Sequence, residues 1–280
     1  MILQEKMGRK LVWNEEFCGD KIDDSKWTFR QSMYNSDAVY DNTDNTIRIE
    51  DGKLHMQVKR IEGEKPYTLN NGFTTADRMY FKYGYLEMRA RIPLRHGAWP
   101  SFWLKSGTQF AKASYMAEID IFEAFSSADT IFSQLHKWNF EGGVKHEILQ
   151  PDQHVSQKYT FNNPDTVNDE YHLYAVEWDE KYLKFYCDDN CYFTYAITED
   201  NDFGNGTLVG MAGFHDFAYV LMNNEIFTEH SWHPGDSMLT EDDEMPIDYY
   251  IDYVRLYQKE GEEIMLQNDI ETQPHTAKFM

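Results

Sequence analysis

Apolar and polar residues alternate with a period of two in many short segments of the chain. The alternation runs through residues 54–58, 86–92 and 182–186, and a longer segment of the same kind covers 249–257. This period is typical of β-strands, because successive side chains point to opposite faces of a strand. Asn-Gly, Asp-Gly and Pro-Gly pairs separate the segments, and no helical periodicity persists over three turns. The pattern indicates an all-β sandwich or barrel.

The chain of 280 residues shows no linker and no internal repeat, so we expect one domain over residues 1–258. Residues 259–280 follow the last predicted strand and are mostly polar, which predicts a loose tail or a short surface helix. Segments 139–170 and 199–246 are rich in Asn, Asp, Glu and Gly and are predicted to be loops.

Composition narrows the choice of partner. The net charge is −22, which disfavours nucleic acid and anionic membranes and mildly favours a neutral ligand. Aromatic residues make up 16 % of the chain. No apolar stretch is long enough to span a membrane as a helix, and residues 1–13 lack the apolar core of a signal peptide. The three cysteines do not make a disulfide framework, and free thiols are expected over a Cys187–Cys191 bridge.

Three acids are interleaved with large apolar residues in the segment 115–125, YMAEIDIFEAF. In a regular strand Glu118 and Asp120 share one face, whereas Glu123 falls on the opposite, apolar face. Burying Glu123 unpaired among isoleucines would be costly, so a one-residue β-bulge at Ile121-Phe122 is the better interpretation. The bulge returns all three acids to one face.

With the bulge, the two outer carboxyl groups can approach to about 5 Å, the separation used by retaining glycosidases. Acids this close must differ in pKa, so that one is ionised while another keeps its proton. The alternative is an ordinary solvated strand face. The aromatic run at 97–104, which includes Trp99 and Trp103, favours a sugar site, because sugars bind flat apolar faces beside polar groups.

From Trp13 to Tyr257 the chain resembles glycoside hydrolase family 16, the laminarinase, agarase, carrageenase and lichenase group. The resemblance rests on segments that occur in the family's order: 11–17, 22–27, 50–54, 83–91, 97–104, 115–125, 134–138, 175–178 and 251–257. It implies a β-jelly-roll sandwich of two antiparallel sheets with a concave substrate cleft. The bulged motif is similar to that of the laminarinase, agarase and carrageenase branches and departs from the lichenases.

The resemblance also implies the roles of the acids. Glu118 matches the nucleophile, Glu123 the general acid/base, and Asp120 the middle acid that hydrogen-bonds the nucleophile. The implied activity is endo-acting, retaining hydrolysis of a β-glycoside, without a catalytic cofactor.

Other residues match substrate-binding positions of the family, each with an ordinary structural alternative. The tryptophans could line the cleft or pack in the core, His136 could bind Asp120 or a sugar hydroxyl or be a core histidine, and Arg78 could lie at the cleft edge or form a surface salt bridge. The implied substrate-binding set is Trp99, Trp103, His136, Trp138, Asn35 and Arg78. Glu16, Gly52 and Asp252 match positions that often hold a structural calcium ion, the alternative being an empty site.

The expected substrate is a polysaccharide or oligosaccharide, and β-1,3-glucan is the leading expectation. Ala117 and Phe122 depart from the usual laminarinase residues. A β-galactan such as agar, porphyran or a mucin-type glycan therefore stays open, as do a transglycosylase and a non-catalytic carbohydrate-binding jelly roll. The resemblance implies a secreted or cell-surface protein, although without a signal peptide in this chain a cytoplasmic location stays open, and we expect a monomer.

Overall fold

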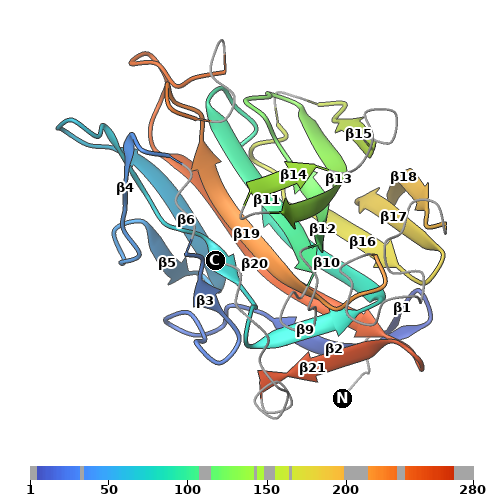
Figure 1. The fold of residues 1–280 in the computed structure, drawn as a ribbon. Coiled ribbons are helices and arrows are strands. Elements are labelled where there is room, and N and C mark those ends of the chain that lie inside the picture. The colour runs from blue at the N-terminus through green and yellow to red at the C-terminus, as the bar shows by residue number, and fades with distance from the viewer. Residues whose placement is uncertain are drawn as a thin grey trace.

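The computed structural model describes residues 5–31, 35–106, 115–141, 144–147, 155–163, 166–198, 214–231 and 237–267. For residues 115–116, 137–141 and 144–147 it describes the backbone alone. The described residues form two large β-sheets that pack face to face (Figure 1). Strand pairing is antiparallel except between β4 and β7.

The first sheet has 11 described strands and includes the long C-terminal strand β20. Its members are β1 (Glu5–Lys6), β2 (Arg9–Glu15), β4 (Ala38–Tyr40), β5 (Ile47–Glu50), β6 (Lys53–Arg60), β7 (Tyr67–Leu69), β10 (Gly84–Arg91), β16 (His172–Trp178), β17 (Tyr182–Cys187), β18 (Asn190–Ala196) and β20 (Ile247–Gln258).

The second sheet has 10 described strands, and β11, β12 and β19 lie beside one another in it. Its members are β3 (Thr28–Phe29), β8 (Phe73–Thr74), β9 (Met79–Lys82), β11 (Ala98–Ser106), β12 (Tyr115–Glu123), β13 (Thr130–Glu141), β14 (Val144–Glu147), β15 (Val155–Thr160), β19 (Ala218–Ile226) and β21 (Glu263–Leu266).

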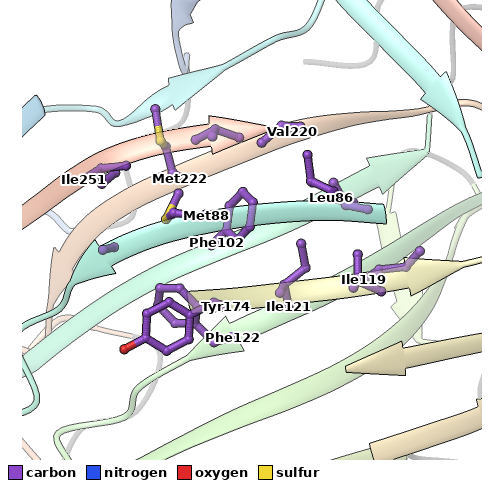
Figure 2. Close-up of a cluster of buried hydrophobic side chains, with 14 of the residues drawn as sticks. Leu86, Met88, Phe102, Ile119, Ile121, Phe122, Tyr174, Val220, Met222 and Ile251 are labelled. Atoms are coloured by element: carbon purple, nitrogen blue, oxygen red, sulfur yellow. The ribbon is translucent and has the colours of Figure 1, made fainter. Parts of the chain in front are cut away.

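The core lies between the sheets and takes alternate residues from each strand. Figure 2 shows Leu86 and Met88 of β10 near Phe102 of β11 and Phe122 of β12. All four are fully buried. The Phe122 ring lies 4.4 Å from the ring of Tyr174, measured between centroids. Because side chains alternate along a strand, β11 and β12 can carry polar groups on the face opposite this core.

The predicted all-β jelly-roll sandwich is confirmed, but two of the predicted loops are partly strands. Segment 139–170 contains the end of β13 and all of β14 and β15, and segment 199–246 contains β19. β19 was not predicted, because the polar run Asn223-Asn224-Glu225 interrupts its apolar pattern. All three of these residues are nevertheless buried. Tertiary hydrogen bonds make their burial possible.

The predicted tail also contains a strand. β21 pairs with β9, so residues 263–266 belong to the second sheet rather than to a loose tail or helix. The turn before it is fixed by Arg9, whose guanidinium lies 2.8 Å from the Glu262 carboxylate. Because these contacts are to strands far away in the sequence, residues 263–266 show no local pattern that would predict a strand. Residues 268–280 lie outside the described residues.

The cysteines are free thiols, as predicted. Cys187 is buried at the end of β17, whereas Cys191 is exposed on β18, where its Cα pairs with Tyr186 and not with Cys187. Within the described ranges, the structure contains no helix long and apolar enough to cross a membrane.

Candidate active site

A β-bulge in β12 places the acids on one face of the strand. Phe102 pairs with Phe122 and Trp103 with Asp120, so Ile121 is one extra residue on β12. The pairing with β13 shifts at the same point, between Asp120 and Glu123. Ile121 and Phe122 both turn toward the core and are buried (Figure 2). The bulge predicted from the cost of burying Glu123 is thus confirmed.

Glu123 accepts hydrogen bonds through both of its carboxyl oxygens. Trp99 Nε1 donates to Oε1 at 2.8 Å, and Gln134 Nε2 donates to Oε2 at 2.9 Å. Burial, followed by repulsion from the charges of Asp120 and Glu118, raises the pKa of Glu123 to about 8, although the two hydrogen bonds work in the opposite direction. Glu123 is therefore protonated at neutral pH and can act as a general acid.

Glu118, Asp120 and His136 form a compact group beside Glu123. One side-chain nitrogen or oxygen of each lies within 4.8 Å of the other two. His136 Nε2 is 3.4 Å from Asp120 Oδ2, and both residues are buried, whereas Glu118 is partly exposed. Glu118 is thus the most accessible of the three, and Asp120 lies close to both Glu118 and His136.

The two tryptophans of β11 occupy different environments on the same face. Trp99 is partly exposed, and its ring stacks on Phe227 with centroids 5.2 Å apart. Trp103 is only 7 % exposed, and its Nε1 donates to Asn223 Oδ1 at 3.0 Å. Trp99 thus contacts the acid directly, while Trp103 is largely covered by protein. Trp138 lies on β13, but its side chain is outside the described part of the structure.

Several polar residues of this face were not found by sequence reasoning. Arg30 Nη1 donates to Asn223 Oδ1 at 2.7 Å, and its guanidinium lies 5.2 Å from the centre of the Trp103 ring. Glu225 is 1 % exposed, burial raises its pKa to about 7, and Tyr40 donates a hydrogen bond to it. The polar residues within the otherwise apolar β19 could have indicated this network, because a buried polar side chain requires hydrogen-bond partners.

Gly72 allows β8 to approach β19 closely at this network. A Cβ atom there would lie 2.4 Å from the Met222 carbonyl oxygen and 2.7 Å from Asn223 Cβ, and Gly72 has a φ of +75°. Only glycine meets both conditions without strain. Gly72 therefore helps to hold Asn223 against Trp103.

Asn35 and Arg78, two of the expected sugar-binding residues, form hydrogen bonds to protein atoms, and their sugar contacts stay a prediction. The Asn35 amide is 3 % exposed and uses its groups on the Ile226 carbonyl, the Thr228 hydroxyl and other protein atoms. Arg78 donates to the carbonyl oxygens of Asp24 and Asp77 at 2.8 and 3.2 Å. Both side chains therefore stabilise turns through these hydrogen bonds.

Two of the residues expected to bind calcium, Glu16 and Asp252, have their carboxylates paired with arginines. Arg255 donates to both carboxylate oxygens of Glu16, at 2.8 and 2.7 Å, which lowers the pKa of that group. Asp252 accepts a hydrogen bond of 2.5 Å from Arg89, and Gly52 lies in the turn between β5 and β6. Calcium needs six to eight oxygen ligands. Here arginines already neutralise both carboxylates.

The hydrogen bond from Gln134 predicts a measurable shift in pH dependence. Replacing Gln134 with leucine removes a donor that stabilises the ionised form of Glu123, so the pKa of Glu123 should rise above its value of about 8. The alkaline limb of the kcat/KM profile should move to higher pH. Gln157→Leu, at an exposed position on the neighbouring β15, is the matched control and should leave the limb in place. A limb that moves to lower pH in Gln134→Leu would contradict the assignment.

The same pKa has a consequence for stability. Because folding raises the Glu123 pKa from 4.5 to about 8, the unfolded chain binds fewer protons between these values. The contribution of this group to stability is therefore present in acid and is lost as pH rises through about 8.

Comparison with known proteins agrees with this fold. Residues 12–259 match the family model described as "Beta-porphyranase A-D, GH16 domain". The chain therefore belongs to glycoside hydrolase family 16, whose enzymes retain anomeric configuration and need no catalytic cofactor.

Among curated proteins, "Glucan endo-1,3-beta-glucosidase A1" of Niallia circulans is 26 % identical over 274 residues, covering 90 % of this chain and 38 % of that protein. "Keratan-sulfate endo-1,4-beta-galactosidase" of Sphingobacterium multivorum is 24 % identical, covering 89 % and 55 %. The chain thus spans well under two thirds of these relatives.

A solved structure shows the same fold. It is described as "Prominent members of the human gut microbiota express endo-acting O-glycanases to initiate mucin breakdown". It superposes with a TM-score of 0.71 at 24 % identity and covers 92 % of this chain and 94 % of its own.

Proposed function

We propose that this chain is an endo-acting, retaining β-glycoside hydrolase. The observation that carries the proposal is the bulge in β12, which places three acids together and leaves Glu123 protonated near neutral pH. A carbohydrate-binding protein without catalytic activity has no need for mutually repelling carboxyl groups at this cost. The family assignment supports the same activity.

In the proposed reaction, Glu118 attacks the anomeric carbon while Glu123 gives its proton to the leaving glycosidic oxygen. The leaving sugar departs, and the ionised Glu123 then takes a proton from water, which attacks the glycosyl-enzyme and releases Glu118. Trp99 and Gln134 hold Glu123 in place through both steps. Asp120 and His136 position the nucleophile.

The leading substrate in this proposal is β-1,3-glucan, supported by the Niallia circulans relative. A β-galactan is the second candidate, supported by the porphyranase description of the family model and by the keratan-sulfate galactosidase relative. The charge of −22 favours a neutral glycan over a sulfated one.

A polysaccharide panel with product sizing tests these alternatives. The panel would contain laminarin, agarose, porphyran, keratan sulfate and a mucin glycan. Oligosaccharides released from laminarin would support the leading substrate, and release only from galactans would replace it. Products longer than the starting oligosaccharide would indicate transglycosylation, and binding without cleavage would overturn the proposed activity.

We further propose that the protein acts as a monomer outside the cell, where such polysaccharides occur. The acids and the two residues that hydrogen-bond Glu123 belong to the same chain, so a monomer is sufficient for the proposed reaction. Light scattering at working concentration tests the oligomeric state.

A further inference from the structure

A second cluster of reactive side chains lies away from the acids, at the edge of the first sheet. His172 begins β16, Cys187 ends β17, and Asp188 follows in the turn to β18. One donor atom from each lies within 4.8 Å of the other two. β15 of the second sheet contacts β18 here, and Figure 1 shows the two strands on the same side of the molecule.

The histidine is held in a way that leaves one ring nitrogen available. Asp188 Oδ2 lies 2.9 Å from His172 Nδ1, and Asp188 Oδ1 accepts the backbone N–H of Leu173 at 2.9 Å. A carboxylate that accepts both bonds places the proton on Nδ1. His172 Nε2 is buried and has no hydrogen-bond partner within the described ranges. A buried nitrogen without a partner is unfavourable, so Nε2 indicates a bound water or small ligand beside the ring.

A hollow of about 160 Å³ adjoins His172 and Asp188, whereas Cys187 lies behind them and does not line it. The hollow offers room for a water or another small ligand. Its lining includes His172, Asp188, Glu170 and Asn163. This volume exceeds that of a single water molecule. Glu170 adds another carboxylate to the polar side of the hollow.

We propose that His172, Cys187 and Asp188 bind a thiophilic divalent cation of the zinc class. Thiolate, imidazole and carboxylate are the ligands that zinc takes in proteins, and three protein ligands leave a fourth position for water or Glu170. The ion takes Nδ1, the ring nitrogen that faces Asp188. Nε2–H can then donate to water in the hollow, so the second nitrogen has a partner, as metal-bound histidines require.

The proposed ion would tie the end of β17 to the start of β16. The ion takes no part in glycoside cleavage. Metal binding at this site can therefore be tested separately from the proposed hydrolase activity. Binding replaces the thiol proton of Cys187 by the metal and releases that proton to solvent. Calcium does not suit the site, because calcium prefers oxygen ligands.

Cobalt(II) is the probe, because a thiolate–cobalt bond gives a charge-transfer absorption that oxygen and nitrogen ligands do not give. The test uses the full chain in a Cys18→Ser/Cys191→Ser background, where Cys187 is the remaining thiol. We expect the absorption to saturate at one equivalent of cobalt, and one equivalent of zinc to abolish it and raise the Tm. The acids with His136 also form a candidate metal cluster, but they contain no sulfur and give no such band.

Three further variants make the result decisive. Cys187→Ser should remove the absorption, and His172→Gln and Asp188→Asn should each weaken cobalt affinity at least about tenfold while keeping the thiol. The last two variants test the site even if Cys187→Ser fails to fold. Absence of the band in the background variant would overturn the proposal. So would a band whose affinity is unchanged in both His172→Gln and Asp188→Asn.

Discussion

Replacing Glu118 with glutamine should lower the turnover of the polysaccharide substrate by about 10⁴-fold or more, because an amide cannot form the glycosyl-enzyme. Glu123→Gln should lower turnover by about 10²–10⁴-fold, the range usual for losing a general acid. Both replacements keep the shape of the side chain. Initial rates of reducing-end formation measure the effect.

The fold should survive both changes. Glu118→Gln removes a charge that raises the Glu123 pKa, so that pKa should fall and the melting temperature should stay level or rise. The control is Glu180→Gln, at a carboxylate that is 70 % exposed, and it should keep full activity. Near-normal turnover in either active-site variant, with unchanged melting, would remove the hydrolase assignment.

Sequence could predict a part of the fold or site where a short segment has only one backbone arrangement of low energy. The bulge follows from three acids and two isoleucines within a few residues, because every other register buries a carboxylate without partners. The strand periodicity of 86–92 and 249–257 likewise requires no knowledge of distant segments, and the structure places β10 and β20 there.

Sequence was least informative where contacts far apart in the chain decide the outcome. β21 exists because its residues pair with β9, about 180 residues earlier in the chain. Asn35 resembles a sugar ligand in sequence, but Ile226 and Thr228 use its amide. The carboxylates of Glu16 and Asp252 are paired with arginines that lie far away in the sequence. Arg30 was missed for the same reason, because its role depends on Asn223.

Azide should distinguish the roles of the two glutamates by the stereochemistry of the product. In Glu118→Ala the missing carboxylate leaves space on the face of the sugar opposite the leaving group. Azide can enter there and attack once, which inverts the β-glycoside to an α-glycosyl azide.

In Glu123→Ala the nucleophile is intact, and a substrate with a good leaving group still forms the glycosyl-enzyme without protonation. Azide then attacks this intermediate from the opposite face and gives a β-glycosyl azide. Proton NMR of the isolated adducts reads the anomeric configuration, and wild-type enzyme in the same azide concentration is the control. Swapped products would exchange the roles of Glu118 and Glu123. A wild-type first product of inverted configuration would instead reject the retaining mechanism and, with it, the short separation of the two carboxyl groups inferred from the bulge.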